Sequence, residues 1–177
     1  MIGAISKLFG GNKSEKDVKK ITPQVAVINQ FFAQYQSLSN DELRNKTAEF
    51  KLRIAAHLGG IDQQITDKKK AAEDLPLEEI NSRDTIYKEI DELKKDRDKA
   101  LEVVLLEILP EAFAVVKETS RRFKENVTLE CTATELDKNL AVKKDNITIS
   151  GDKVIYKNTW TAGGGSVTWN MVIMTCS

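Results

Sequence analysis

Residues 39–80 read SNDELRNKTAEFKLRIAAHLGGIDQQITDKKKAAEDLPLEEI, and this stretch decides the fold. A helix is predicted to begin after Ser39, because Ser39 and Glu42 have the spacing of a capping box. Apolar residues then recur every three or four positions, which indicates a helix with one buried face. They are Leu43, Phe50, Ile54, Leu58, Ile61 and Ile65, and Thr47 takes the position between the first two. Gly59-Gly60 predicts a bend, and Leu75-Pro76-Leu77 predicts a turn that reverses the chain.

A second amphipathic helix is predicted after this turn. Its apolar positions are Ile80, Ile86, Ile90, Leu93, Leu101, Val104 and Ile108. Two such helices joined by a short turn favour an antiparallel helical hairpin. Pro110 is expected to end or kink the return helix, which resumes over 111–123.

The flanking segments complete an α+β fold that is mostly α. On the N-terminal side a helix is expected from Ser14, with a kink or restart near Pro23. On the C-terminal side we expect a short helix over 136–143 and a hairpin of strands 146–150 and 153–158 around Gly151-Asp152. A third strand over 166–173 would complete a small antiparallel three-stranded unit. The expected organisation is therefore a tip (1–11), a helical region (12–125) containing the hairpin (about 55–108), and a β unit (126–177).

Composition limits the possible functions. The 177 residues carry 27 basic and 27 acidic side chains, so no overall field attracts nucleic acid, and we expect no nucleic-acid partner. The two cysteines form no disulfide framework, which favours a reducing cytoplasm. No stretch reaches the roughly 20 apolar residues of a membrane span, and the first nine residues do not resemble a cleaved signal peptide.

The first 20 residues form the one asymmetric patch, with five lysines and two acidic residues. Apolar residues with helical spacing would insert into a lipid interface: Ile2, Ile5, Leu8 and Phe9. Lysines would face an anionic membrane: Lys7, Lys13, Lys16, Lys19 and Lys20. Such attachment would be weak and reversible. The alternative is a terminal helix that docks on its own domain.

Catalytic and metal-binding residues are not expected. His57 is the only histidine, and one histidine with two distant cysteines does not make a zinc site. Gly163-Gly164-Gly165 lacks the Gly-Lys-Ser/Thr of a phosphate-binding loop and is interpreted as a hairpin loop. The basic runs Lys68-Lys69-Lys70 and Arg121-Arg122 have acidic neighbours and are interpreted as exposed helix faces.

Three segments of the sequence resemble SecA-type preprotein translocase motors. They are Ile5-Ser6-Lys7-Leu8-Phe9-Gly10 with Asp17-Val18-Lys19-Lys20, then Leu38–Phe50 (LSNDELRNKTAEF), and Leu109–Glu118 (LPEAFAVVKE). The resemblance covers about 5–53 and 109–123. It makes 55–108 a long insertion and 132–171 a second one.

The resemblance implies a role in ATP-driven protein export. The complete motor would use ATP and Mg²⁺ to push unfolded preproteins through a SecY-type channel, and its N-terminal helix would contact acidic lipid and that channel. Met171 lies where the family has a Met at the edge of the adenine pocket, so the β unit would be the incomplete start of a nucleotide-binding domain. Residues 172–177 depart from the family pattern, and the chain is expected to be a fragment or a frameshifted product that ends before the phosphate loop.

We therefore expect the N-terminal part of an export motor, without catalysis of its own and without a bound cofactor. It would attach to the inner face of the plasma membrane from the cytoplasm and pack against the rest of the motor domain. The alternative is a self-standing interaction module built on the helical hairpin, with a possible homodimer.

Overall fold

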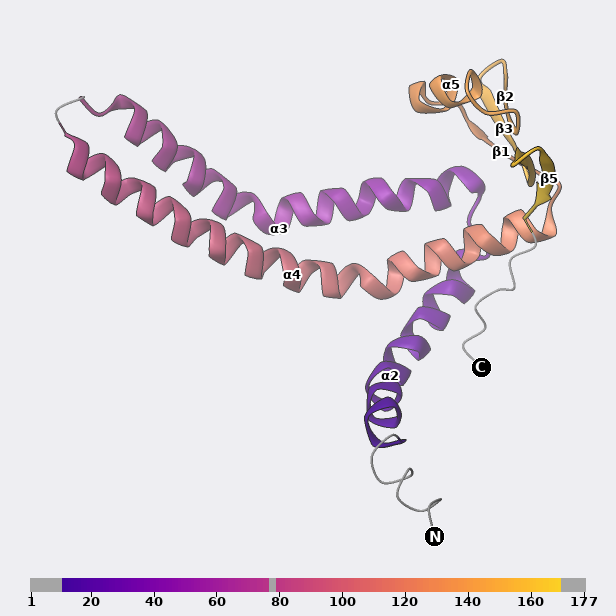
Figure 1. Cartoon of the computed structure of the whole chain (residues 1–177), viewed down its shortest axis with the longest axis horizontal. Coiled ribbons are helices and arrows are strands. Elements are labelled where there is room, and N and C mark those ends of the chain that lie inside the picture. Colours follow the sequence, from indigo (N-terminus) through magenta and orange to yellow (C-terminus); the bar gives the residue numbers. More distant parts are fainter. Residues whose placement is uncertain (1–10, 77–78, 170–177) are drawn as a thin grey trace, which may run out of the picture. The chain divides into compact units, whose positions relative to one another are not determined.

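Three long helices dominate the computed structural model, which describes residues 11–76 and 79–169 (Figure 1). They are α2 (Gly11–Tyr35), α3 (Asn40–Asp74) and α4 (Ile80–Glu125). The chain divides into two compact units. We call Thr47–Leu109 the hairpin unit and the described residues on both sides of it, 11–46 and 110–169, the anchor unit. The expected fold class, mostly α with a small antiparallel β part, is confirmed.

The hairpin unit consists of the adjoining parts of α3 and α4, which run side by side in opposite directions (Figure 1). Ion pairs fix the antiparallel register, since Asp62 pairs with Arg97 at 2.5 Å and Lys68 pairs with Glu89 at 2.5 Å. The buried apolar residues of this unit are Leu58, Ile65, Ala72, Ile90, Val104 and Ile108. All except Ala72 are positions that the apolar spacing selects, but Ile80, which it also selects, is 65 % exposed because it lies at the first turn of α4.

Neither helix breaks where the sequence suggests an interruption. α3 continues through Gly59 and Gly60, and α4 continues through Pro110. The prediction that the return helix could end at Pro110 is therefore wrong, because the helix is continuous from Ile80 to Glu125. A proline removes a single N–H from a helix, and packing of a long amphipathic face outweighs that loss. The reversal of the chain between the helices is confirmed, although Leu77 of the predicted turn lies outside the described residues. Arg83 of α4 donates a hydrogen bond to the Leu75 carbonyl at 2.5 Å.

The anchor unit joins the C-terminal half of α2, the start of α3 and the end of α4. Tyr35, Leu43 and Ala114 form its buried core, and half-buried apolar side chains pack against them: Ile28, Phe31, Phe32, Leu38 and Val115. α2 begins at Gly11 rather than at Ser14 and does not restart at Pro23. The capping box of α3 is confirmed, because the Ser39 amide donates to Glu42 at 2.7 Å and the Glu42 amide donates to the Ser39 hydroxyl at 3.2 Å.

A three-stranded antiparallel sheet follows α4, with the order β1-β3-β2. Its strands are β1 (Thr128–Thr132), β2 (Ile147–Ser150) and β3 (Lys153–Lys157). The hairpin at Gly151-Asp152 is confirmed, with Gly151 at a φ of 61°. The short helix is also confirmed as α5 (Glu135–Ala141), which Thr134 caps.

The expected third strand of this sheet is wrong. Residues 165–168 form β5 (Gly165–Thr168), which pairs with β4 (Thr159–Ala162) in a separate two-stranded ladder. Gly163 and Gly164 both have positive φ, at 58° and 79°, and two such residues make the tight turn that pairs consecutive strands. The third strand of the sheet is β1, which pairs with β3 on the side away from β2. Residues 170–173 of the expected strand lie outside the described residues.

Candidate functional site

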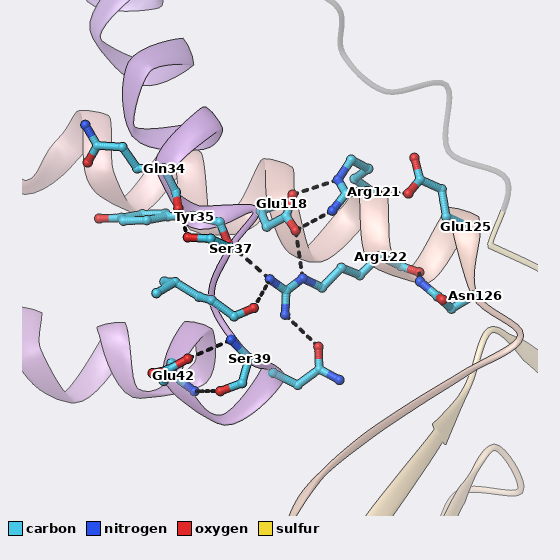
Figure 2. Close-up of polar contacts among 12 residues, drawn as sticks. Gln34, Tyr35, Ser37, Ser39, Glu42, Glu118, Arg121, Arg122, Glu125 and Asn126 are labelled. Atoms are coloured by element: carbon cyan, nitrogen blue, oxygen red, sulfur yellow. Dashed lines mark hydrogen bonds and ion pairs between the residues drawn. The ribbon is translucent and has the colours of Figure 1, made fainter.

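Arg122 is the centre of a buried polar network in the anchor unit (Figure 2). Only 8 % of the residue is exposed. Its guanidinium donates to Glu118 at 2.7 Å, to the side chain of Asn40 at 2.7 Å, and to the carbonyls of Tyr35 and Leu38 at 3.1 and 2.6 Å. This one side chain therefore ties the end of α4 to the whole connection between α2 and α3. We call these contacts the Arg122 network.

Glu118 is the anionic member of the network and is fully buried. Burial alone would raise the pKa of its carboxyl, but hydrogen bonds from Arg121 and Arg122 outweigh burial and hold the pKa below its ordinary value. Arg121 donates two of these bonds, at 2.8 and 2.7 Å. The expectation that Arg121-Arg122 forms an exposed helix face is wrong, because the acidic neighbour at position 118 turns inward with them.

Further contacts hold the second half of α2 against α4. The Tyr35 hydroxyl donates to Glu111 at 3.1 Å. The Lys117 ammonium donates to Asn29 at 2.7 Å and lies 4.6 Å from the centre of the Phe32 ring. Together with the apolar core, these contacts fix α2 from about Ile28 onward.

The first half of α2 has a different environment. Every residue from 16 to 24 is exposed, including Lys16, Lys19 and Lys20. Val18 and Ile21 are apolar and are 59 % and 55 % exposed, one helical turn apart. None of the three lysines forms an ion pair within the described residues. This stretch combines three lysines, one carboxylate (Asp17) and two apolar side chains, and none of them joins the buried core of the anchor unit. We call it the basic stretch, residues 16–21.

The predicted lipid-binding residues lie mostly beyond what the structure describes. Lys16, Lys19 and Lys20 are exposed on α2, and Lys13 belongs to α2 without a described side chain. The others fall outside the described residues, as does the predicted adenine-edge residue: Ile2, Ile5, Lys7, Leu8, Phe9 and Met171.

A second polar cluster docks the β part on the first turns of α3. The Asn40 side chain donates to the Glu130 carbonyl at 2.9 Å, and the amide of Thr132 donates to Asp41 at 2.7 Å. Arg44 donates to the Thr132 carbonyl at 3.3 Å. These side chains occupy backbone groups on the outer edge of β1, so that edge is closed to pairing with another strand.

Asp137 is the buried carboxylate of this cluster. Burial opposes its charge, but bonds from Arg44 at 2.7 Å, from Tyr156 and from Thr134 outweigh burial and hold the pKa of Asp137 far below its ordinary value. Burial and the bond to Asp137 raise the pKa of Tyr156 to about 12. Sequence reasoning missed this cluster, although Thr134 and Asp137 have the spacing of a helix cap.

A phosphate-binding loop is not among the features of this sequence. The sequence contains no Gly-Lys-Ser/Thr, and Gly163 and Gly164 form the turn between β4 and β5 rather than a loop before a helix. Within the described part of the chain, no group of His, Cys, Asp or Glu side chains could hold a metal ion. No described helix is long and apolar enough to cross a membrane.

Comparisons with known proteins identify the family. The model of the SecA DEAD-like domain matches residues 5–133. The chain belongs to the SecA family. The protein translocase subunit SecA of Parabacteroides distasonis is 44 % identical over 168 residues, which are 95 % of this chain and 15 % of the relative. The same subunit of Cytophaga hutchinsonii is 44 % identical over 174 residues, 97 % of this chain and 15 % of the relative.

The matches to SecA extend across both predicted insertions. They cover 95 % and 97 % of the chain, so sequences similar to 55–108 and 132–171 occur in these relatives as well. The chain spans about 15 % of the length of the SecA relatives that it matches. No solved structure matches the chain.

Proposed function

We propose that this chain is the membrane-attaching and motor-packing segment of a SecA-type protein translocase in the Sec pathway. The basic stretch carries the proposal, because it is exposed and cationic while the second half of the same helix is fixed to the anchor unit. In this arrangement the exposed first half of α2 would attach the rest of the protein to a membrane surface. The surface is the anionic inner face of the plasma membrane, reached from the cytoplasm.

The energetics support a weak and reversible attachment. Insertion of Val18 and Ile21 would gain about 0.8 kcal/mol for each CH₂ group that leaves water. Each lysine near an anionic surface adds about 1 kcal/mol. The predicted tip residues Ile2, Ile5, Leu8 and Phe9, which lie outside the described residues, would add further apolar contacts with lipid. A SecY-type channel beside the lipid is the proposed protein partner of this helix.

We propose ATP-driven transport for the complete translocase only, and not for this chain by itself. In the complete protein, ATP and Mg²⁺ would drive unfolded preproteins through the channel, and the anchor unit would pack against the remaining motor domain. This chain supplies no phosphate loop, so it would take no part in hydrolysis itself.

Vesicle flotation tests the attachment. The chain should float with vesicles that contain phosphatidylglycerol and should stay behind with phosphatidylcholine alone. K16Q/K19Q/K20Q should reduce flotation about tenfold or more, since three surface charges are lost. The control is K69Q/K70Q/K88Q, which removes three exposed lysines of the hairpin unit and should float normally. Equal loss in both triple variants, or unchanged flotation after deletion of residues 1–21, would contradict the proposal.

A second candidate function is a protein-interaction module formed by the hairpin unit. Its apolar side chains at Leu52, Val103, Leu105 and Leu106 are between 45 % and 70 % exposed, which favours a partner such as a second copy of the chain. Sedimentation over a range of concentrations separates the two functions. A dimer that persists in K16Q/K19Q/K20Q and is lost in L106Q would favour the module.

A further inference from the structure

A pocket with aromatic walls lies in the anchor unit, away from α2. Its volume is about 370 Å³. The lining comes from the end of α4, the turn between α5 and β2, the three-stranded sheet and the β4–β5 ladder. Phe123, Tyr156, Trp160 and Trp169 form the aromatic part of the wall. We call this the aromatic pocket.

The rings of the wall are inclined to one another. Phe123 and Trp169 have centroids 5.7 Å apart and planes at 47°, and Trp160 and Trp169 are 6.1 Å apart at 55°. Phe123 and Tyr156 meet edge to face at 88°. A nucleobase held between two rings needs those two rings to be parallel. These inclined rings contact one another and form one continuous apolar wall, which suits a branched aliphatic side chain.

The charged residues of the pocket are predominantly cationic. Lys144 and Lys157 line it, are exposed, and form no ion pair within the described residues. Asp145 also lines it, and a hydrogen bond from Thr161 lowers the pKa of its carboxyl, so this group stays ionised and the lining carries two positive charges and one negative charge. The indole N–H of Trp169 is bonded to the Ser120 carbonyl at 3.3 Å. The aromatic wall therefore offers apolar surface, and the two lysines offer unpaired positive charge.

We propose that the aromatic pocket binds a branched aliphatic side chain of an extended polypeptide whose neighbouring residues are acidic. The aliphatic group enters the cavity and packs against the wall that the rings form, because removal of apolar surface from water is favourable. The flanking carboxylates remain in solvent and pair with Lys144 and Lys157, so charge selects among apolar peptides. This site is independent of the membrane attachment proposed above.

The two tryptophans of the sequence both line the pocket, so intrinsic tryptophan emission is a probe of this site alone. Three capped tetrapeptides are titrated into the full chain: acetyl-Glu-Leu-Leu-Glu-amide, its Lys-Leu-Leu-Lys counterpart, and Glu-Ser-Ser-Glu. The first should change the emission saturably. The second should bind more weakly, and the third should cause no saturable change.

Substitutions at the lysines test the role of charge. K144Q and K157Q should each weaken binding of the acidic peptide about two- to fivefold, as expected for an exposed ion pair. The double variant should no longer distinguish acidic from basic peptide. K143Q is the matched control, since Lys143 is the exposed neighbour that does not line the pocket, and its affinity should be unchanged.

Several results would overturn the proposal. One is an emission change of the same size with the serine peptide, and another is an equal loss of affinity in K143Q and K144Q. A saturable change with ATP that is stronger than with the leucine peptide would make the pocket a nucleotide site instead. Circular dichroism of each variant confirms that the fold is retained, which surface lysine substitutions should not disturb.

Discussion

Replacement of Arg122 by methionine should strongly destabilise the anchor unit. Methionine keeps much of the apolar stem but loses four hydrogen bonds, to Glu118, Asn40, Tyr35 and Leu38. The Leu38 carbonyl and the Asn40 amide oxygen then lose these donors. Glu118 stays buried and charged, with Arg121 as its remaining cationic partner.

The expected loss follows from these contacts. Removing one partner of a buried ion pair costs about 3–5 kcal/mol. Arg121 still compensates Glu118, so the lower end of that range, about 3 kcal/mol, applies to R122M. R121M is the matched comparison: it removes two bonds to the same carboxylate, but its side chain is 25 % exposed and Arg122 remains in place. Its cost should be about 1 kcal/mol.

Urea unfolding followed by tryptophan emission measures both variants. Trp169 contacts α4 through Phe123 and Ser120, so its emission reports the unit that contains the Arg122 network. With a slope of about 1–2 kcal/mol per molar urea, R122M should lower the midpoint by about 2 M and R121M by well under half of that. A midpoint for R122M that is no lower than that of R121M would refute the assignment of Arg122 as the centre of the network.

Three further predictions concern single side chains. The pKa of Asp137 is lowered in the folded state, so its ionised carboxylate stabilises the fold above the ordinary pKa, and this contribution is lost as the pH falls. D137N should therefore be less stable than the parent at neutral pH. The difference between their urea midpoints should become smaller in acid. The pKa of Tyr156 is raised to about 12, so its neutral hydroxyl stabilises the fold below the ordinary pKa of tyrosine, and this contribution is lost as the pH rises towards 12. In a titration followed by the ultraviolet absorbance of tyrosinate, the parent should show an ionisation near pH 12 that Y156F lacks. S39A removes the side-chain half of the α3 capping box and should lower the free energy of unfolding by about 1 kcal/mol in the same urea assay.

The hairpin could be predicted from the sequence because its determinants are local. Among the positions that helical spacing selected in the hairpin unit, Leu58, Ile65, Ile90, Val104 and Ile108 are buried, and Ile80 at the end of the helix is exposed. The cap at Ser39 and the turn at Gly151-Asp152 also depend on residues within a few positions of one another. Short-range geometry is sufficient in each case.

The Arg122 network and the aromatic pocket could not be predicted in this way. Arg122 bonds residues 82 to 87 positions away, and nothing in the local run of charges around 118–125 distinguishes a buried arginine from an exposed one. The wall of the pocket draws Phe123, Tyr156, Trp160 and Trp169 from separate elements. Its composition depends on β1 joining β3 and on β5 pairing with β4. The sequence analysis predicted no strand at β1 and assigned residues 166–173 to the three-stranded unit.

Local charge, rather than net charge, determines where an acidic surface can bind to this chain. Acidic and basic residues balance overall, yet many of them pair with near neighbours on one helix, as Lys94 does with Asp91 and Lys99 with Asp96. α2 has no acidic residue from Val18 to Tyr35, a length of about 27 Å at 1.5 Å per residue. At physiological ionic strength, charges more than about 8 Å apart are largely screened. Asp17 lies within one turn of Lys20 and offsets part of this charge, but carboxylates farther along the sequence do not neutralise Lys19 and Lys20. A neutral chain can therefore still present a cationic helix to an anionic membrane.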